Sequence, residues 1–121
     1  MIKPDLTIDL EQASYPVYIK GDILDSFHEI SSDLFLPSNI FVIADSAVWN
    51  LYSFKLESFL ANKNYSVFEV KGGKSCKNFS TVLSIFQEMD ELNFPRNTLI
   101  IAFGGGVIGD LAAFVASCWY R

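Results

Sequence analysis

The sequence predicts an α/β fold in which a parallel sheet is flanked by helices and preceded by an antiparallel pair of strands. Three observations support this prediction. Short apolar stretches rich in Ile, Val and Phe alternate with longer amphipathic stretches, and glycines follow two of the later apolar stretches. Half of the 121 residues are hydrophobic, which is enough to build one core. We therefore expect a single domain over residues 1–121.

The first three elements are predicted from their patterns and caps. Residues 6–10 alternate between apolar and polar side chains, and residues 15–19 form a second strand, so an antiparallel pair is expected. A short helix over residues 23–30 follows. Asp22 is a candidate N-cap, because a short carboxylate accepts hydrogen bonds from the first N–H groups of a helix.

The rest of the chain repeats a strand followed by a helix. We expect strands over 39–44, 65–70 and 98–103, helices over 47–62 and 78–93, and a last helix that opens at Gly109. Alternation of this kind requires right-handed crossovers and a parallel sheet that is covered on both faces. In the helix over 78–93, one apolar face is predicted from the spacing of Phe79, Val82, Leu83, Phe86 and Met89.

Charge and composition exclude several classes of protein. The formal net charge of −5, from nine basic and fourteen acidic residues, argues against binding to nucleic acid. We expect no membrane segment and a cytoplasmic protein, because no apolar stretch is long enough to span a bilayer and no signal peptide opens the chain. The sixteen Phe and Tyr residues are interpreted as core packing. With only His28, Cys76 and Cys118 as soft ligands, no metal site is expected in this chain.

The segment GGGVIGD at residues 104–110 directly follows the last predicted strand. Glycines let a ligand approach the main chain closely, and the first N–H groups of the next helix favour an anion, so phosphate is the natural ligand. A turn that only packs the helix on the sheet is the alternative. The Gly-x-Gly-x-x-Gly spacing is weak evidence by itself, because the usual dinucleotide fingerprint follows the first strand of its unit.

The longer string GGGVIGDLAAFVASCWYR, residues 104–121, resembles the signature of the 3-dehydroquinate synthase family, the sugar phosphate cyclases. Three further segments agree in order and spacing: YPVYIKG at 15–21, IADSAV at 43–48 and GKSCK at 73–77. The resemblance covers nearly the whole chain. It implies a Rossmann-like, NAD-binding N-terminal portion and a C-terminal helical domain that is absent here, so we expect a fragment or a truncated gene product.

The resemblance also implies roles for seven residues. The backbone of Gly105, Gly106 and Val107 would contact the pyrophosphate of NAD, Asp45 the adenosine ribose and Asp110 the nicotinamide ribose, while Lys77 would neutralise cofactor or bound phosphate and Arg121 would hold the substrate phosphate. Position alone allows simpler roles. Asp45 is also placed as an N-cap or turn residue, Asp110 as a first-turn acid that the helix dipole stabilises, and Arg121 as a chain end.

Two positions depart from the family pattern. Lys74 stands where the family usually has Glu, and an ammonium group cannot accept a hydrogen bond from a ribose hydroxyl. Ala47 stands where an amide side chain is common. Both departures favour a specialised cyclase or a weakened relative. A phosphate-loop interpretation of residues 72–75 fails, because Phe68 stands where that motif needs its first glycine.

Two kinds of function follow from the resemblance. The first is the NAD-binding part of a 3-dehydroquinate synthase, an NAD- and metal-dependent lyase that eliminates phosphate from 3-deoxy-D-arabino-heptulosonate 7-phosphate to give 3-dehydroquinate in the shikimate pathway. The family implies a phosphorylated sugar substrate, zinc or cobalt ligands outside this chain, no catalytic residue within it, and a homodimer. Cyclases that make 2-deoxy-scyllo-inosose or valiolone rings are alternatives. The second kind is a non-catalytic nucleotide-binding module.

Overall fold

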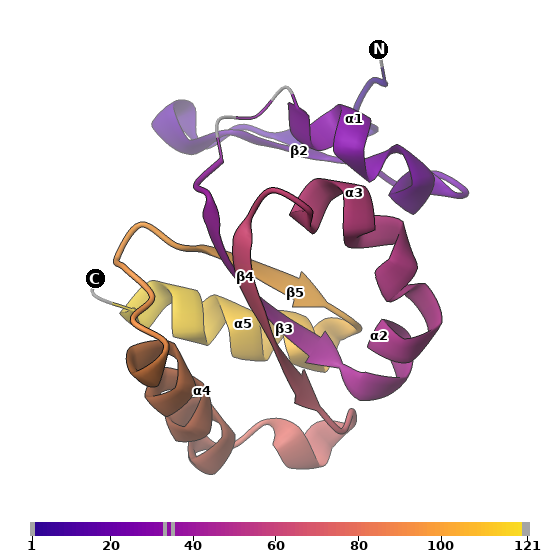
Figure 1. The fold of residues 1–121 in the computed structure, drawn as a ribbon. Helices are drawn as coiled ribbons and strands as arrows, with labels where there is room; N and C mark the ends of the chain where they lie inside the picture. The colour runs from indigo at the N-terminus through magenta and orange to yellow at the C-terminus, as the bar shows by residue number, and fades with distance from the viewer. Residues whose placement is uncertain (1, 33, 35, 120–121) are drawn as a thin grey trace. The chain divides into compact units, whose positions relative to one another are not determined.

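A computed structural model describes residues 2–32, 34 and 36–119. The chain forms two compact units, residues 1–35 and residues 36–121, whose elements are drawn in Figure 1. The single domain expected from the composition stays a prediction. Among the described residues, no helix is both long and apolar enough to cross a membrane.

The first unit contains the predicted antiparallel pair. Strand β1 (Leu6–Ile8) pairs with β2 (Tyr15–Val17), and the 3₁₀ turn η1 (Glu11–Ala13) connects them. The pair is confirmed, although each strand is two residues shorter than predicted. Beyond it lie η2 (Ile23–Ser26) and α1 (Phe27–Ser32).

The N-cap role predicted for Asp22 is wrong. Asp22 adopts a left-handed conformation with φ of 54°, and its side chain makes no capping hydrogen bond. A capping side chain requires an extended backbone at its own residue, which directs the carboxylate back to the helix N–H groups. The segment that follows therefore starts as a 3₁₀ turn and becomes α-helical only at Phe27.

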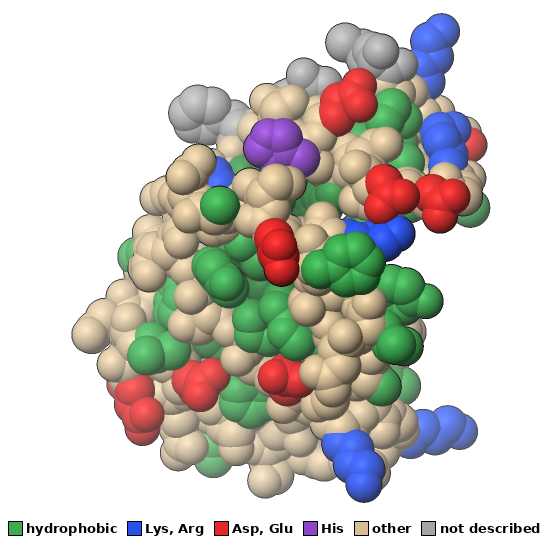
Figure 2. Space-filling model, turned by 45° about the vertical axis from the view of Figure 1, so that its right-hand side comes forward, with side chains coloured by type: hydrophobic (Ala, Val, Ile, Leu, Met, Phe, Trp, Pro, Cys, Tyr) green, Lys and Arg blue, Asp and Glu red, His purple; other side chains and the backbone are tan. Residues whose placement is uncertain are grey.

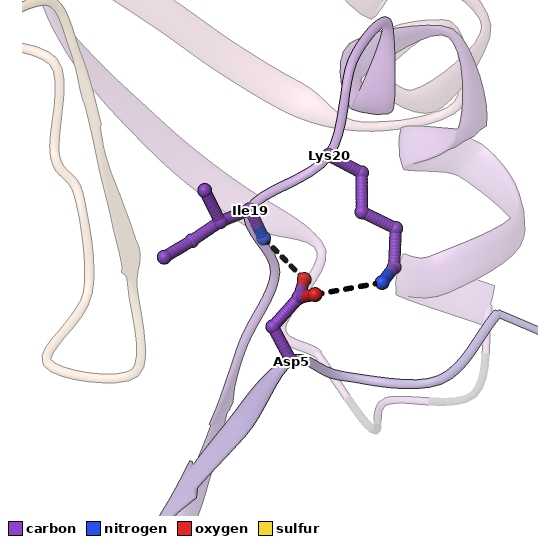
Figure 3. A network of polar contacts seen from close by, with 3 residues as sticks. All are labelled: Asp5, Ile19 and Lys20. Carbon is purple, nitrogen blue, oxygen red and sulfur yellow. Dashed lines mark hydrogen bonds and ion pairs between the residues drawn. The ribbon is translucent and has the colours of Figure 1, made fainter.

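Asp5 ties the hairpin to the segment that leaves it. Its carboxylate accepts hydrogen bonds from the backbone N–H of Ile19 at 2.6 Å and from Lys20 Nζ at 2.9 Å (Figure 3). The Ile19 N–H and then the Lys20 ammonium stabilise the ionised form, so they hold the pKa of Asp5 below its ordinary value of 3.8.

Acid is expected to release this contact. Because the folded pKa is depressed, the contact stabilises the hairpin above the unfolded pKa of 3.8, and this stabilisation is lost as the pH falls through the folded value. NMR titration from about pH 6 to pH 2 should show the Ile19 amide resonance moving with a midpoint below the ordinary Asp value. Asp5→Asn should abolish that titration. A midpoint at or above the ordinary value would contradict the assignment.

The second unit is built on a parallel sheet of three strands. Strands β3 (Asn39–Asp45), β4 (Asn64–Val70) and β5 (Leu99–Phe103) are arranged in the order β4-β3-β5. Residues 40–44 of the central strand are 0% exposed. A continuous apolar run of this kind is typical of a strand that is buried on both faces, and the predicted parallel sheet is confirmed.

Helices cover both faces of the sheet (Figure 1). Helices α4 (Phe79–Glu91) and α5 (Gly106–Cys118) pack on one face, where the core also takes in Phe41 and Ile43 of β3. Ala44 pairs with Phe103, so Phe103 belongs to the opposite face. There Trp49 of α2 (Ser46–Tyr52) packs edge-on against the Phe103 ring, with centroids 5.6 Å apart.

Two helix predictions need correction. The helix expected over 47–62 is divided into α2, the 3₁₀ turn η3 (Ser53–Leu56) and α3 (Glu57–Leu60), and Tyr52 departs from helical backbone angles where α2 ends. In α4, the buried stripe consists of Val82, Ile85 and Met89, whereas Phe79 and Leu83 are 81% and 57% exposed. Both exposed residues lie outside that stripe, so the predicted apolar face was too wide.

Candidate functional site

The three parallel strands end at one edge of the sheet. Asp45 pairs with Val70, and the preceding Ala44 pairs with Phe103. The loops that leave β4 and β5 therefore start on either side of Asp45. Ligands of open α/β sheets bind in the crevice at this carboxyl edge.

Asp45 occupies the centre of this edge and is half-buried. Its Oδ1 accepts hydrogen bonds from the N–H groups of Ala47 at 2.9 Å and Val48 at 3.3 Å, so Asp45 is the N-cap of α2. The capping role that its position suggests is confirmed. These two bonds also fix the carboxylate at the sheet edge, where an anionic acceptor for ligand hydroxyl groups would be needed.

Two glycines pack against Asp45: Gly104, the first glycine of the predicted phosphate-binding segment, and Gly72, which the sequence did not single out as a site residue. A Cβ at Gly72 would overlap Asp45 Oδ2. A Cβ at Gly104 would lie 2.8 Å from Ile108 Cγ1 and 3.1 Å from Asp45 Cβ, both closer than ordinary contacts. Gly72 and Gly104 thus let the two loops close on the carboxylate. The only sequence signal for Gly72 is that it follows a strand end.

The glycine turn after β5 places the start of α5 earlier than predicted. The helix begins at Gly106 rather than Gly109, and Gly105 is its N-cap, with the Gly109 N–H bonding to the Gly105 carbonyl at 3.0 Å. No side chain caps this end of α5. The main-chain N–H groups of its first turn are therefore the donors that this end of the helix offers to an anion.

The packing of the chain itself does not require glycine at Gly105 or Gly106. A Cβ at either position would meet nothing within 4 Å, and both residues are exposed. Gly105 has φ of −85°, which any residue adopts, and only Gly73 has positive φ among the described glycines. The turn-packing alternative therefore accounts for Gly104 alone. At Gly105 and Gly106, no side chain covers the main chain, so an external group can approach it.

Lys77 and Asp110 meet although 33 residues separate them. Lys77 Nζ lies 2.9 Å from Asp110 Oδ2, and their side chains are 58% and 61% exposed. Exposed pairs of this kind contribute at most about 1 kcal/mol to stability. A ligand could therefore contact either side chain, or separate the two, at little cost in free energy. Asp110 is the fifth residue of α5, and the first turn holds no acid. The first-turn interpretation of Asp110 is therefore wrong, because the helix begins three residues before the predicted start.

A groove of about 460 Å³ lies beside this ion pair. It is lined by Lys77, Asn78, Phe79, Val82, Asp110, Leu111 and Phe114. The rings of Phe79 and Phe114 pack edge to face with centroids 6.4 Å apart, and both are exposed. The interpretation of the aromatic residues as core is wrong for these two. In Figure 2, hydrophobic side chains, in green, reach the surface between charged groups.

The loop after β4 is held in one conformation by its own residues. Gly73 has φ of 109°, a region that L side chains rarely adopt, and η4 (Lys74–Cys76) follows it. The Cys76 side chain is buried, and its Sγ lies 3.1 Å from the Gly73 carbonyl oxygen. Lys71 and Lys74 are exposed on this loop, and neither forms an ion pair within the described part of the chain.

Val107 and Arg121 complete the set of predicted site residues. Val107 is partly buried in the first turn of α5. Arg121, predicted to hold a substrate phosphate, lies outside the described residues. Cys76 and Cys118 are free thiols, and the residues that the structure describes contain no group of three or more His, Cys, Asp or Glu that could hold a metal ion.

Comparisons with known sequences agree with the motifs. A family model described as "3-dehydroquinate synthase N-terminal" matches residues 67–121. The chain is 35% identical over 119 residues to a 3-dehydroquinate synthase of Clostridium beijerinckii, covering 97% of this chain and 34% of that protein. It is 33% identical over 125 residues to the enzyme of that name from Prochlorococcus marinus subsp. pastoris, covering 100% of this chain and 34% of the relative. The chain thus spans about a third of these relatives.

Solved structures of sugar phosphate cyclases share the fold. A 2-deoxy-scyllo-inosose synthase, solved with carbaglucose-6-phosphate, NAD⁺ and Co²⁺, has a TM-score of 0.77 at 23% identity, covering 96% of this chain and 32% of that one. A 2-epi-5-epi-valiolone synthase of Streptomyces hygroscopicus subsp. jinggangensis, solved with NAD⁺ and Zn²⁺, has a TM-score of 0.71 at 27% identity, covering 93% and 31%. The resemblance that the motifs indicate is therefore confirmed: nearly the whole of this chain is similar to about a third of the length of proteins of the 3-dehydroquinate synthase family, and its fold is that of sugar phosphate cyclases.

Proposed function

We propose that this chain binds NAD at the carboxyl edge of its sheet, as the N-terminal part of a sugar phosphate cyclase. The observation that carries the proposal is the open glycine surface at Gly105 and Gly106. It leads directly into the uncapped start of α5, next to the fixed carboxylate of Asp45. Main-chain donors for a diphosphate and an acceptor for ribose hydroxyls thus lie at one edge, which is the combination that a dinucleotide needs.

The residues present fit the cofactor. The N–H groups at Gly106 and Val107 would hold the pyrophosphate, since this end of α5 has no capping side chain. Asp45 would accept hydrogen bonds from the hydroxyls of the adenosine ribose. Asp110, paired with Lys77, would contact the ribose at the nicotinamide end, where the apolar groove offers contact area for a ring.

The chain's own contribution to a reaction would be binding and orientation. When bound, NAD would supply a hydride acceptor that oxidises a substrate hydroxyl. The Lys77 ammonium would neutralise phosphate charge near the ion pair, and the glycine surface would fix the diphosphate and with it the position of the nicotinamide. No described residue is assigned to proton transfer or to a metal, so the chemistry of a complete enzyme would need groups beyond this set.

For the whole protein we propose 3-dehydroquinate synthase, which eliminates phosphate from 3-deoxy-D-arabino-heptulosonate 7-phosphate in the shikimate pathway. The sequence relatives that carry this name support it. The same proposal includes a divalent metal (zinc or cobalt), a homodimer in the cytoplasm, and a substrate phosphate that Arg121 would hold. The second candidate is a cyclase that makes 2-deoxy-scyllo-inosose or valiolone rings; the valiolone synthase, at 27% identity, supports the latter.

Asp45→Asn is expected to weaken NAD binding about tenfold while the fold stays stable. Asn caps helices as well as Asp does, so the bonds to Ala47 and Val48 should persist. The lost carboxylate charge removes a strong acceptor for the ribose hydroxyls, and a hydrogen bond to a charged group contributes about 1.5–3 kcal/mol. Isothermal titration calorimetry with NAD⁺ and thermal unfolding measure both effects.

A result of equal NAD⁺ affinity in Asp45→Asn and the parent chain would remove Asp45 from the site. Failure of the parent chain itself to bind NAD⁺ would count against the proposed function as a whole. Lys63→Gln is a suitable control, because Lys63 directly precedes β4 at the opposite edge of the sheet and should leave NAD⁺ affinity unchanged.

A further inference from the structure

The loop after β4, which closes on Asp45, carries positive charge that the binding of a neutral ribose diol would not require. Asp45 is paired with Val70 in the sheet, so Lys71 lies one residue beyond the end of that pairing. Gly72, the next residue, adjoins the Asp45 carboxylate itself. Lys74 follows two residues later, at the start of η4. The loop that adjoins this carboxylate through Gly72 therefore carries two lysines.

These two lysines are uncommitted, whereas the neighbouring charges are engaged. Lys71 and Lys74 are exposed and form no ion pair within the described part of the chain. Lys77, the third lysine of the segment, is paired with Asp110, and Asp45 Oδ1 already accepts two backbone hydrogen bonds. Two positive charges and one negative charge leave a formal charge of +1 at this end of the site.

The backbone of this loop is also preorganised, which fixes the points from which the two lysine side chains extend. Gly73 adopts a conformation that favours glycine, and the buried Cys76 anchors the turn in the core. Asn78 Nδ2 donates to the Ser75 carbonyl at 2.6 Å, and Asn78 Oδ1 accepts from the Thr81 N–H at 2.8 Å. Ordering the loop should therefore cost little when a ligand binds.

We propose that this loop lets the site accept a 2′-phosphate on the adenosine ribose, so that NADP binds as well as NAD. The inference rests on the proposed function and concerns the same site. A carboxylate alone selects against a 2′-phosphate by charge repulsion, and basic side chains nearby accommodate it. Lysine binds phosphate as a point charge, and the phosphate adds close to two negative charges that Lys71 and Lys74 offset.

The test is calorimetric titration of the 121-residue chain with NAD⁺ and with NADP⁺ at two salt concentrations. We expect the two dissociation constants to lie within about tenfold of each other, and NADP⁺ binding to weaken more steeply as salt rises. Lys74→Glu should weaken NADP⁺ binding at least about tenfold, whereas NAD⁺ binding should stay equal or become tighter, because a carboxylate at this position can accept a hydrogen bond from a ribose hydroxyl. Lys63→Glu is the matched control, with the same charge change beside the opposite edge of the sheet.

Each outcome has a distinct meaning. If NAD⁺ binds while NADP⁺ is weaker by more than about tenfold, the inference is overturned and the proposed function stands. The same holds if Lys74→Glu and Lys63→Glu change NADP⁺ binding equally, because the effect is then one of net charge. If neither nucleotide binds, the proposed function itself is overturned.

Discussion

Gly105→Val is expected to abolish NAD binding while the chain stays folded. The position is exposed, its φ of −85° suits any residue, and a Cβ there would meet nothing within 4 Å. The isopropyl group should therefore meet no clash, and the loss of glycine as the N-cap of α5 should cost the fold at most about 1 kcal/mol. It would project over the main chain where a diphosphate has to approach the N–H groups of α5, and we expect at least a hundredfold loss of affinity, about 2.7 kcal/mol.

The measurement is calorimetry with NAD⁺, alongside circular dichroism during thermal unfolding. Ala113→Val is the matched control, because it adds the same side chain to an exposed position of α5 further along the helix. The control should keep the affinity of the parent. Parent-like NAD⁺ affinity in Gly105→Val would show that the glycine turn does not bind the diphosphate.

Gly104→Val should have the opposite consequence, a loss of stability of about 2 kcal/mol. A Cβ at Gly104 would lie 2.8 Å from Ile108 Cγ1, and Ile108 is 1% exposed, so its side chain has little room to move. The Asp45 Cβ at 3.1 Å blocks the other direction. Forcing extra carbon into a packed site of this kind typically costs 1–3 kcal/mol.

Urea denaturation of Gly104→Val and Gly105→Val gives the comparison directly. The first variant should unfold at a clearly lower urea concentration than the parent, and the second at a concentration closer to that of the parent. Gly104→Ala, which adds a single carbon, should fall between Gly104→Val and the parent. Equal stability of the Gly104 variants and the parent would contradict the packing around Asp45.

The sheet was predictable from the sequence because its signal is local. Strands β3, β4 and β5 are short apolar runs bounded by polar or glycine residues, and alternation with helices requires the parallel arrangement. The start of α5 was not predictable in the same way. Glycine has a low helix propensity, so Gly106 and Gly109 favoured a loop, yet both lie inside the helix. Because α5 begins at Gly106 and not at Gly109, Asp110 lies beyond the first turn in which it was predicted.

The rest of the site depends on register, which no local pattern contains. The pairing of Asp45 with Val70 brings Gly72 against a carboxylate 27 positions earlier in the chain. The Lys77 and Asp110 pair likewise needs α5 to pack beside the start of α4. Motif resemblance selected most of these residues individually, but it did not indicate which of them touch or that Gly72 and Gly104 are needed for packing.

The central claim is that the main chain at the start of α5 binds a diphosphate, and NMR titration of isotope-labelled chain with NAD⁺ tests it most directly. We predict that the amide resonances of Gly105, Gly106 and Val107 move furthest and saturate with one dissociation constant. ADP, which carries the diphosphate and the adenosine ribose, should move the same three amides. Saturable NAD⁺ binding that leaves these three resonances in place would contradict the account.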